Sequence, residues 1–270
     1  MSSTIKKNKI GLVEGRKILI TGISGKLSIA YGIAKVLYQN GAKLAFSCQN
    51  ERIKSRVEKI ARQFESEIVI PCDVSSDENI RIFFSRLEKI WGQFDGFVHS
   101  IAYANQNQFR GNYLNVVTRK DFEVAHSISS YSLVEMVKSC RSMLRKGSTV
   151  LTITYIGSSL SIPNYNVMGP AKASLESNVR YIASSLKESK IRINAISSGP
   201  ILTISSSRIR NFRKMHRRFE KNILTEKISI EDIGKCAVFL CSDLSSGING
   251  EIIHVDGGFN FVYGNCFEEE

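Results

Sequence analysis

A tyrosine and a lysine standing seven residues apart are the side chains best placed for joint chemistry in this 270-residue chain. Tyr165 and Lys172 fall at the start of a stretch whose apolar spacing predicts an amphipathic helix. At about 3.6 residues per turn, both side chains share one helix face and stand about 10 Å apart along the axis. A phenol and an ammonium arranged in this way can address a single bound cofactor, which indicates an active site.

The composition limits the class of protein. With 43% apolar residues the chain can bury a full core, and it has no apolar run of about 18 residues that would span a membrane. We therefore expect one globular domain over 1–270, with a flexible N-terminus at 1–10 and a tail at 263–270. Residues 1–9 lack the apolar stretch of a secretory signal, so we expect a cytoplasmic protein without a membrane partner.

The cysteine spacing and the net charge limit which metals and partners the chain can bind. Six cysteines lie without a Cys-x-x-Cys pair or a neighbouring histidine, which argues against a zinc site and against a disulfide framework. The formal charge of +12 predicts a surface that attracts anions. Its densest basic cluster runs from Arg208 to Lys221, and both a solvated helix face and a docking surface are open interpretations. No base-reading or aromatic-rich motif accompanies it, so we expect no nucleic-acid partner.

Short apolar runs alternate with stretches of helical periodicity along the chain. The run at 17–21 ends in Gly22, and a helical pattern follows over 28–39. Repetition of this order predicts an α/β fold, a single-domain Rossmann-like doubly wound parallel sheet of about seven strands with helices on both faces. Its ligand should lie beyond the carboxyl ends of the strands. The other predicted strands are 43–47, 67–71, 94–99, 149–154, 191–197 and 251–255, and the other predicted helices are 51–64, 78–91, 119–144, 165–189 and 230–241.

The first strand–helix junction has the small residues that a phosphate-binding turn requires. Gly22 can supply a tight turn, and Ser28 and Ala30 are small enough for close approach of the backbone. Backbone N–H groups at the N-terminus of the next helix can then hold a pyrophosphate. The pattern is not G-x-G-x-x-G, and an ordinary turn is the alternative. Its place at the first junction favours a dinucleotide site.

Residues after the later strands bear on the cofactor. Gln49 follows the second strand and can bind ribose hydroxyls without repelling or neutralising a phosphate, which favours NADH. Arg52 and Lys54 keep NADPH open. Asp73 ends the third strand, where it can accept from an adenine amino group or cap the next helix. His99 ends an apolar strand, and we interpret it as hydrogen-bonded structure rather than as a general base.

Four motifs carry a resemblance through their order and spacing. They are Gly22-x5-Ser28-x-Ala30, His99-Ser100-Ile101-Ala102, Ile162-Pro163-Asn164-Tyr165-Asn166-Val167-Met168-Gly169 and His254-Val255-Asp256-Gly257-Gly258-Phe259. Over nearly its whole length the chain resembles the NADH-dependent enoyl-acyl-carrier-protein reductases of bacterial type II fatty-acid synthesis. These enzymes are a divergent branch of the short-chain dehydrogenase/reductase superfamily, whose ordinary members place a lysine where this chain has Gly169.

The resemblance implies an activity and a set of site residues. The activity is reduction of the trans-2 double bond of enoyl-acyl-carrier-protein by hydride transfer from NADH to the β-carbon, in the last step of fatty-acid elongation. In the implied catalytic set, Tyr165 stabilises the enolate, Lys172 grips the nicotinamide ribose, and Tyr155 faces the substrate or shapes the pocket. The implied cofactor contacts are Gly22, Ser28, Ile29, Gln49, Asp73, Val74, Ile101, Lys172, Ile201 and Thr203.

The resemblance also implies a substrate-binding lid over 199–224 and a homotetramer. Arg210, Arg213 and Lys214 match basic positions that dock the acidic acyl carrier protein, which gives the basic cluster a purpose. The implied substrate contacts are Ala104, Tyr155, Tyr165, Met168, Ile209 and Phe212.

Three departures from the family pattern qualify these expectations. Ala102 replaces a common glycine, and its methyl group should narrow the pocket or lower inhibitor sensitivity. Pro170 should kink the predicted helix unless it falls in the first turn. The segment 224–227 replaces a proline-containing basic segment after the lid.

Two other functions stay open at this point. A carbonyl reductase of the wider superfamily would also use a tyrosine acid, although Gly169 speaks against it. A noncatalytic protein that binds NAD or nucleic acid is the other alternative.

Overall fold

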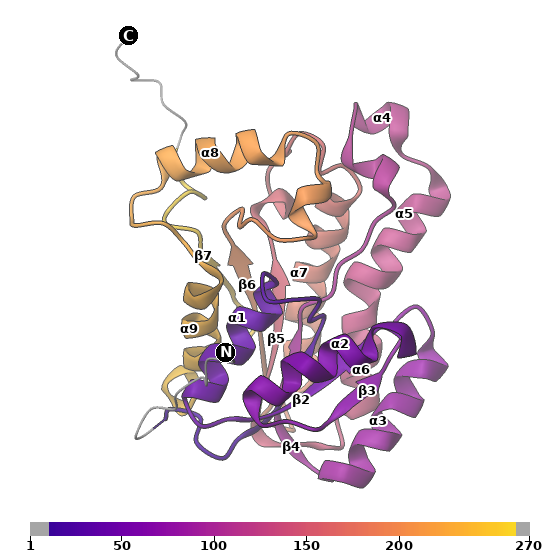
Figure 1. The fold of residues 1–270 in the computed structure, drawn as a ribbon, viewed down its shortest axis with the longest axis vertical. Coiled ribbons are helices and arrows are strands. Elements are labelled where there is room, and N and C mark those ends of the chain that lie inside the picture. The colour runs from indigo at the N-terminus through magenta and orange to yellow at the C-terminus, as the bar shows by residue number, and fades with distance from the viewer. Residues whose placement is uncertain (1–10, 263–270) are drawn as a thin grey trace.

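The computed structural model describes residues 11–262, and their backbone forms a parallel sheet between two layers of helices (Figure 1). Seven strands follow the order β3-β2-β1-β4-β5-β6-β7, and each neighbouring pair is parallel. This architecture confirms the predicted doubly wound sheet. The expected flexible N-terminus at 1–10 and tail at 263–270 lie outside the described residues. The strands are β1 (Lys17–Thr21), β2 (Lys43–Cys48), β3 (Val69–Pro71), β4 (Phe94–His99), β5 (Leu144–Thr154), β6 (Arg192–Ser198) and β7 (Ile252–Val255).

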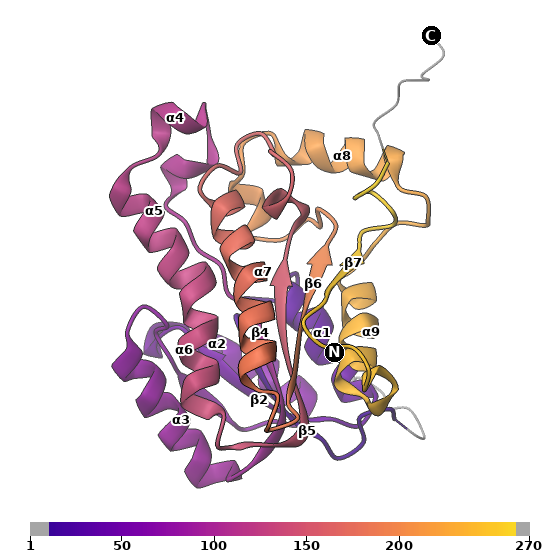
Figure 2. The ribbon, with the colours of Figure 1, turned by 180° about the vertical axis from the view of Figure 1, so that it is seen from behind.

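Helices cover both faces of the sheet, and one of them lies across its end. In both views α8 crosses above the arrowheads of β5 and β6, at the carboxyl ends of the strands (Figures 1 and 2). No helix within 11–262 is long and apolar enough to cross a membrane. The helices are α1 (Ile29–Gln39), α2 (Glu51–Ala61), α3 (Asp77–Trp91), α4 (Tyr113–Val116), α5 (Arg119–His126), α6 (Ser132–Cys140), α7 (Met168–Ser185), α8 (Phe212–Asn222) and α9 (Ile230–Cys241).

Alternate residues of each central strand supply two separate cores. On β1, Ile18 and Ile20 pack into the cluster beneath α1, α2 and α9. Leu19 points the other way, into the cluster beneath α3, α6 and α7. This period of two follows from the pleat of a strand, and a strand buried on both faces is apolar throughout. A third apolar cluster lies outside the sheet and joins α7 to the segment before α8.

The helix predicted over 119–144 is confirmed over 119–140, but it contains a π-helical turn and ends earlier than predicted. The segment forms α5, a π-helical turn at Ser127–Tyr131 and then α6, and Leu144 already begins β5. A π turn holds one more residue than an α turn, and periodicity alone does not reveal it. Here the Ser129 hydroxyl accepts from the backbone N–H of Tyr103 at 2.9 Å and lies 3.1 Å from the carbonyl oxygen of the same residue.

The placement of Tyr165 on a helix is also wrong. The helix α7 begins only at Met168, because Asn164 and Asn166 adopt left-handed backbone angles with φ of +64° and +42°. A right-handed helix cannot include such residues. Pro170 is the third residue of α7, where the backbone N–H has no partner within the helix. Pro170 therefore does not interrupt the hydrogen bonds that hold Lys172 in the helix.

Candidate active site

A cavity of about 420 Å³ opens at the carboxyl ends of the strands. Its walls come from the residues that follow six of the strands, from α7, and from the segment that leads into α8. Ala104, the remaining predicted substrate contact, is buried in the same apolar cluster as Ile209 and Phe212 and does not itself line the cavity. The other predicted residues that the fold brings to this cavity are Gly22, Ser28, Ile29, Gln49, Asp73, Val74, Ile101, Tyr155, Tyr165, Met168, Lys172, Ile201, Thr203, Ile209 and Phe212.

The first strand–helix junction leaves backbone exposed to the cavity. Gly22 has a φ of +79°, and a Cβ atom added there would lie 1.9 Å from the carbonyl oxygen of Ser100. Only glycine fits this close crossing of two loops. Ser28 caps α1 by accepting from the N–H of Tyr31 at 3.3 Å, and its hydroxyl donates to the carbonyl oxygen of Gly25 at 2.7 Å. The N-terminus of α1 is therefore fixed beside the cavity, where it favours an anion.

The end of the cavity beside β2 suits an adenine ribose without a 2′-phosphate. Exposed Gln49 lines it, whereas Arg52 and Lys54 do not, and Lys54 pairs with Glu51 at 3.5 Å. The Asp73 carboxylate accepts from the N–H and the hydroxyl of Ser75 at 3.0 and 2.8 Å.

The alternative in which Asp73 caps the next helix is wrong. The N-cap of α3 is Ser76, whose hydroxyl accepts from the N–H of Asn79 at 3.3 Å. Asp73 thus stays at the cavity wall with a carboxylate that can accept from a ligand.

Two tyrosine rings form the wall above β5. The rings of Tyr155 and Tyr165 meet edge to face, with centroids 5.1 Å apart. Gly157 makes room for them, since a Cβ atom there would lie 2.6 Å from the Tyr165 ring. Burial raises the pKa of both phenols well above the ordinary value, and both are therefore protonated at neutral pH. Each phenol keeps an O–H to donate.

Lys172 is a buried ammonium at the base of the cavity. Only 5% of the residue is exposed, and its Nζ donates to the carbonyl oxygen of Ile153 at 2.7 Å. Desolvation lowers its pKa to about 8, and the nearby Glu176 carboxylate opposes that shift. Sequence reasoning missed Glu176. Its place four residues after Lys172, on the same face of a helix, was the signal that could have found it.

His99 serves the structure around this site. It is fully buried on β4, and its ring nitrogens lie 3.1 Å from the Thr152 hydroxyl and 2.8 Å from the Ser132 hydroxyl. Burial, and then the charge of Lys172, lower the pKa of His99 to about 3. The ring is neutral at physiological pH and ties β4 to β5 and α6.

A buried histidine fastens α8 over the cavity. His216 donates from Nδ1 to the carbonyl oxygen of Pro200 at 2.8 Å. The rings of Phe212 and Phe219 lie nearly parallel to it, with centroids 6.4 and 6.3 Å away. The spacing of Phe212, His216 and Phe219 predicts one shared helix face, but no local pattern predicts the hydrogen bond to Pro200. The predicted docking residues Arg210, Arg213 and Lys214 are exposed and do not line the cavity.

A second cavity, of about 480 Å³, lies beside the amino ends of the strands. Lys187, Arg192 and Asn249 line it, but the Arg192 guanidinium is already hydrogen-bonded to three backbone carbonyl oxygens. The described residues hold no group of three or more metal-ligating side chains. The chemistry available to a ligand is therefore concentrated at the carboxyl ends.

Known proteins are similar to this chain in sequence and in fold. A family model described as enoyl-(acyl carrier protein) reductase matches residues 22–260. The NADH-dependent enoyl-[acyl-carrier-protein] reductase of Escherichia coli K12 is 53% identical over 260 residues, which cover 96% of this chain and 99% of that protein.

Solved structures give the same result. The NADH-dependent enoyl-[acyl-carrier-protein] reductase of Aquifex aeolicus superposes with a TM-score of 0.90 at 42% identity, covering 93% of this chain and 99% of that one. The enzyme of Anaplasma phagocytophilum, solved in complex with NAD, gives a TM-score of 0.92 at 33% identity, covering 98% and 99%. Sequence, fold and the cavity with its tyrosines and lysine together establish that the chain belongs to the enoyl-acyl-carrier-protein reductase family.

Proposed function

We propose that this chain reduces the trans-2 double bond of an enoyl group carried on acyl carrier protein, with NADH as the reductant, in the last step of the fatty-acid elongation cycle. The observation that carries the proposal is the single cavity at which Tyr165, Lys172 and the residues of the first strand–helix junction meet. No contact described at this cavity favours a carbonyl reductase or a noncatalytic protein over this function.

The residues at the cavity fit a nicotinamide dinucleotide. At Gly22 there is no room for a side chain, so a pyrophosphate can approach the backbone beside the N-terminus of α1. At the other end, Lys172 presents a buried amine that can bind the nicotinamide ribose hydroxyls. When bound, NADH supplies the hydride that the β-carbon of the enoyl thioester receives.

Tyr165 acts as the hydrogen-bond donor for the thioester oxygen, on which negative charge gathers as an enolate. The phenol is held protonated by burial and lies on the cavity wall. A donor fixed in a dry site stabilises such a transition state by about 3 kcal/mol. Tyr155 supports the Tyr165 ring through their edge-to-face contact and forms part of the same wall. Protonation at the α-carbon completes the reduction.

The segment 199–224 acts as the lid of the substrate site. Ile209 and Phe212 turn apolar surface toward the cavity and suit an acyl chain, while Arg210, Arg213 and Lys214 stay exposed on the outside. These cations suit an acidic carrier protein that delivers the acyl chain to the lid. Ala102 lies on the cavity wall and its methyl group narrows the space there.

The family resemblance extends the proposal to a homotetramer in the cytoplasm. Sedimentation of the purified 30.2 kDa chain at about four times its own mass would support the assembly. A monomer at micromolar concentration would contradict it.

An anaerobic absorbance assay tests the reaction and the cofactor together. NADH and NADPH are each mixed with the enzyme and crotonyl thioester, with the saturated butyryl thioester as the control. We expect NADH to be consumed with the crotonyl thioester, NADPH to be consumed more slowly, and neither to be consumed with the control. Consumption with a β-ketoacyl thioester alone would make the protein a carbonyl reductase.

A further inference from the structure

An acidic side chain that the mechanism does not use lies next to the catalytic lysine. Glu176 stands one helical turn beyond Lys172 on α7, and both side chains reach the end of β5. Lys172 donates to the carbonyl oxygen of Ile153 at 2.7 Å, and the Thr154 hydroxyl donates to Glu176 Oε1 at 2.6 Å. Two consecutive residues of β5 therefore each hold one charged side chain of α7: Ile153 holds the Lys172 ammonium, and Thr154 holds the Glu176 carboxylate.

Burial makes the charge on Lys172 costly, and its other neighbours do not offset the cost. His99 on β4 is neutral, because its pKa is about 3. Tyr155 after β5 and Tyr165 before α7 are uncharged, because burial raises the pKa of each phenol. Besides the Ile153 carbonyl oxygen, which accepts from Nζ, the Glu176 carboxylate is the one titratable group among the described residues that favours the charged form of Lys172.

Glu176 bears on Tyr165 as well. Burial and the neighbouring phenol of Tyr155 are the larger causes that raise the pKa of Tyr165, and the Glu176 carboxylate adds to them. A negative charge at this position thus opposes ionisation of the phenol while it favours the ammonium. Because burial already keeps the phenol protonated at neutral pH, the effect that bears on the proposed reaction is the one on Lys172.

We infer that Glu176, held by the Thr154 hydroxyl, is a positioning residue that keeps Lys172 charged for the cofactor ribose. The inference rests on the proposed function, because that function assigns the ribose to Lys172. Glu176 does not line the cavity and acts through Lys172.

The charge on Lys172 decides in which direction NADH affinity changes with pH. The charged amine is present below its pKa of about 8 and is lost as the pH rises through that value. Affinity for NADH should therefore fall on the alkaline side. Replacing the carboxylate by an amide removes the attraction that opposes desolvation, so the same fall should occur at lower pH.

Titration of NADH fluorescence from about pH 6 to about pH 10 tests the inference without any turnover. In Glu176→Gln we expect the midpoint of the fall in NADH affinity to move down by about one pH unit. Affinity at about pH 7.5 should drop about threefold. The control is Glu188→Gln, which removes an exposed carboxylate beyond the end of α7 and should leave the profile unchanged.

Two further variants guard against a purely structural effect. Thr154→Val keeps the carboxylate but removes its clamp, and it should move the midpoint in the same direction by a smaller amount. Glu176→Asp keeps the charge and should restore part of the profile. A wild-type pH profile in both Glu176→Gln and Thr154→Val would overturn the inference. The crotonyl assay on the unmodified enzyme reports separately whether the proposed function itself holds.

Discussion

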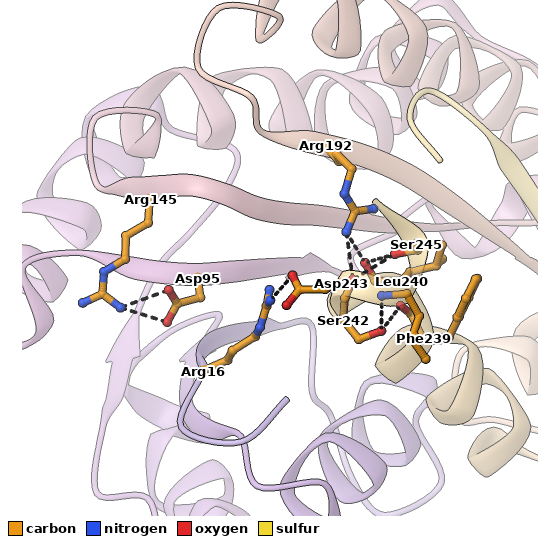
Figure 3. A network of polar contacts seen from close by, with 10 residues as sticks. Arg16, Asp95, Arg145, Arg192, Phe239, Leu240, Ser242, Asp243 and Ser245 are labelled. Atoms are coloured by element: carbon orange, nitrogen blue, oxygen red, sulfur yellow. Dashed lines mark hydrogen bonds and ion pairs between the residues drawn. The ribbon is translucent and has the colours of Figure 1, made fainter. Parts of the chain in front are cut away.

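The two ends of the parallel sheet differ in how their polar groups are used. At the carboxyl ends, Gly22, Gln49, Asp73 and Lys172 turn backbone or polar side chains toward a cavity. At the amino ends, several charged side chains are paired within the chain, as Figure 3 shows for Arg16 with Asp243, 2.5 Å apart. One end therefore retains groups that can bind a ligand, and the other end uses its groups to hold the fold together.

Arg192 is the centre of the amino-end network. It begins β6, is 9% exposed, and donates to the carbonyl oxygens of Leu240 and Ser242 at 3.0 and 3.2 Å (Figure 3). It also donates to the carbonyl oxygen of Ile248 at 3.2 Å. These carbonyl groups lie at and beyond the end of α9, where a helix leaves acceptors without partners. The comparison teaches that similar buried cations have opposite tasks: Arg192 satisfies the chain's own acceptors, whereas Lys172 remains at a cavity wall.

The largest expected effect comes from Tyr165→Phe. The substitution removes the donor to the thioester oxygen but keeps the ring, so kcat should fall by about 100-fold or more. Affinity for NADH, measured by fluorescence, should stay the same. The control is Tyr181→Phe, which removes a hydroxyl from an exposed tyrosine of α7. A kcat within about twofold of wild type would remove Tyr165 from the mechanism.

At the opposite end, Arg192→Met should affect stability and not catalysis. Three backbone acceptors lose their donor, which should lower the free energy of unfolding by about 2 kcal/mol. Thermal unfolding measures the loss of stability. The kcat of the folded fraction shows whether catalysis is unchanged. If kcat fell while Tm stayed constant, the division of tasks between the two ends would be wrong.

The docking surface gives a smaller effect at the carboxyl end. Arg213→Glu combined with Lys214→Glu should lower kcat/KM about tenfold for an enoyl group on acyl carrier protein, because the variant repels an acidic partner. The effect should shrink as salt is added. Activity on an enoyl N-acetylcysteamine thioester should not change. The matched control reverses Arg86 and Lys89, two exposed cations of α3; equal losses in both variants would point to net charge rather than docking.

The smallest effect is expected from Arg145→Ala. Arg145 pairs with Asp95 at 3.0 Å, but 45% of its side chain is exposed (Figure 3). Exposed ion pairs contribute little, so the free energy of unfolding should fall by about 0.5 kcal/mol in a denaturant titration. A loss above about 2 kcal/mol would mean that this pair belongs to the buried network and not to the surface.

The strands and most helices could be predicted because their signals are local. The run at 17–21 is apolar on both faces of a strand and ends in Gly22, and the ladder between β1 and β2 follows from it. The final helix 230–241 was predicted with the observed bounds. A capping box of Ser229 and Asp232 fixes its N-terminus. Here propensity, capping and burial agree.

The geometry around Tyr165 could not be predicted from periodicity. The residues 162–167 carry the same apolar spacing as a helix, but two asparagines take left-handed angles and turn the segment toward the lid. That choice depends on tertiary contacts: Asn166 donates to the carbonyl oxygen of Gln108, 58 positions away, at 2.8 Å. The Thr154–Glu176 hydrogen bond joins a strand to a helix. No local sequence pattern predicts that these two side chains lie close together.

The π turn at Ser127–Tyr131 makes one helical segment belong to two layers. Before it, Ala125 packs in the cluster beneath the lid; after it, Leu133 packs against the sheet. Because no loop separates α5 from α6, the helical backbone runs without a break from one cluster to the other. The Ser129 hydroxyl, which belongs to the π turn, holds the backbone of Tyr103, a residue of the cavity wall. The shape of that wall therefore depends on the packing of both clusters.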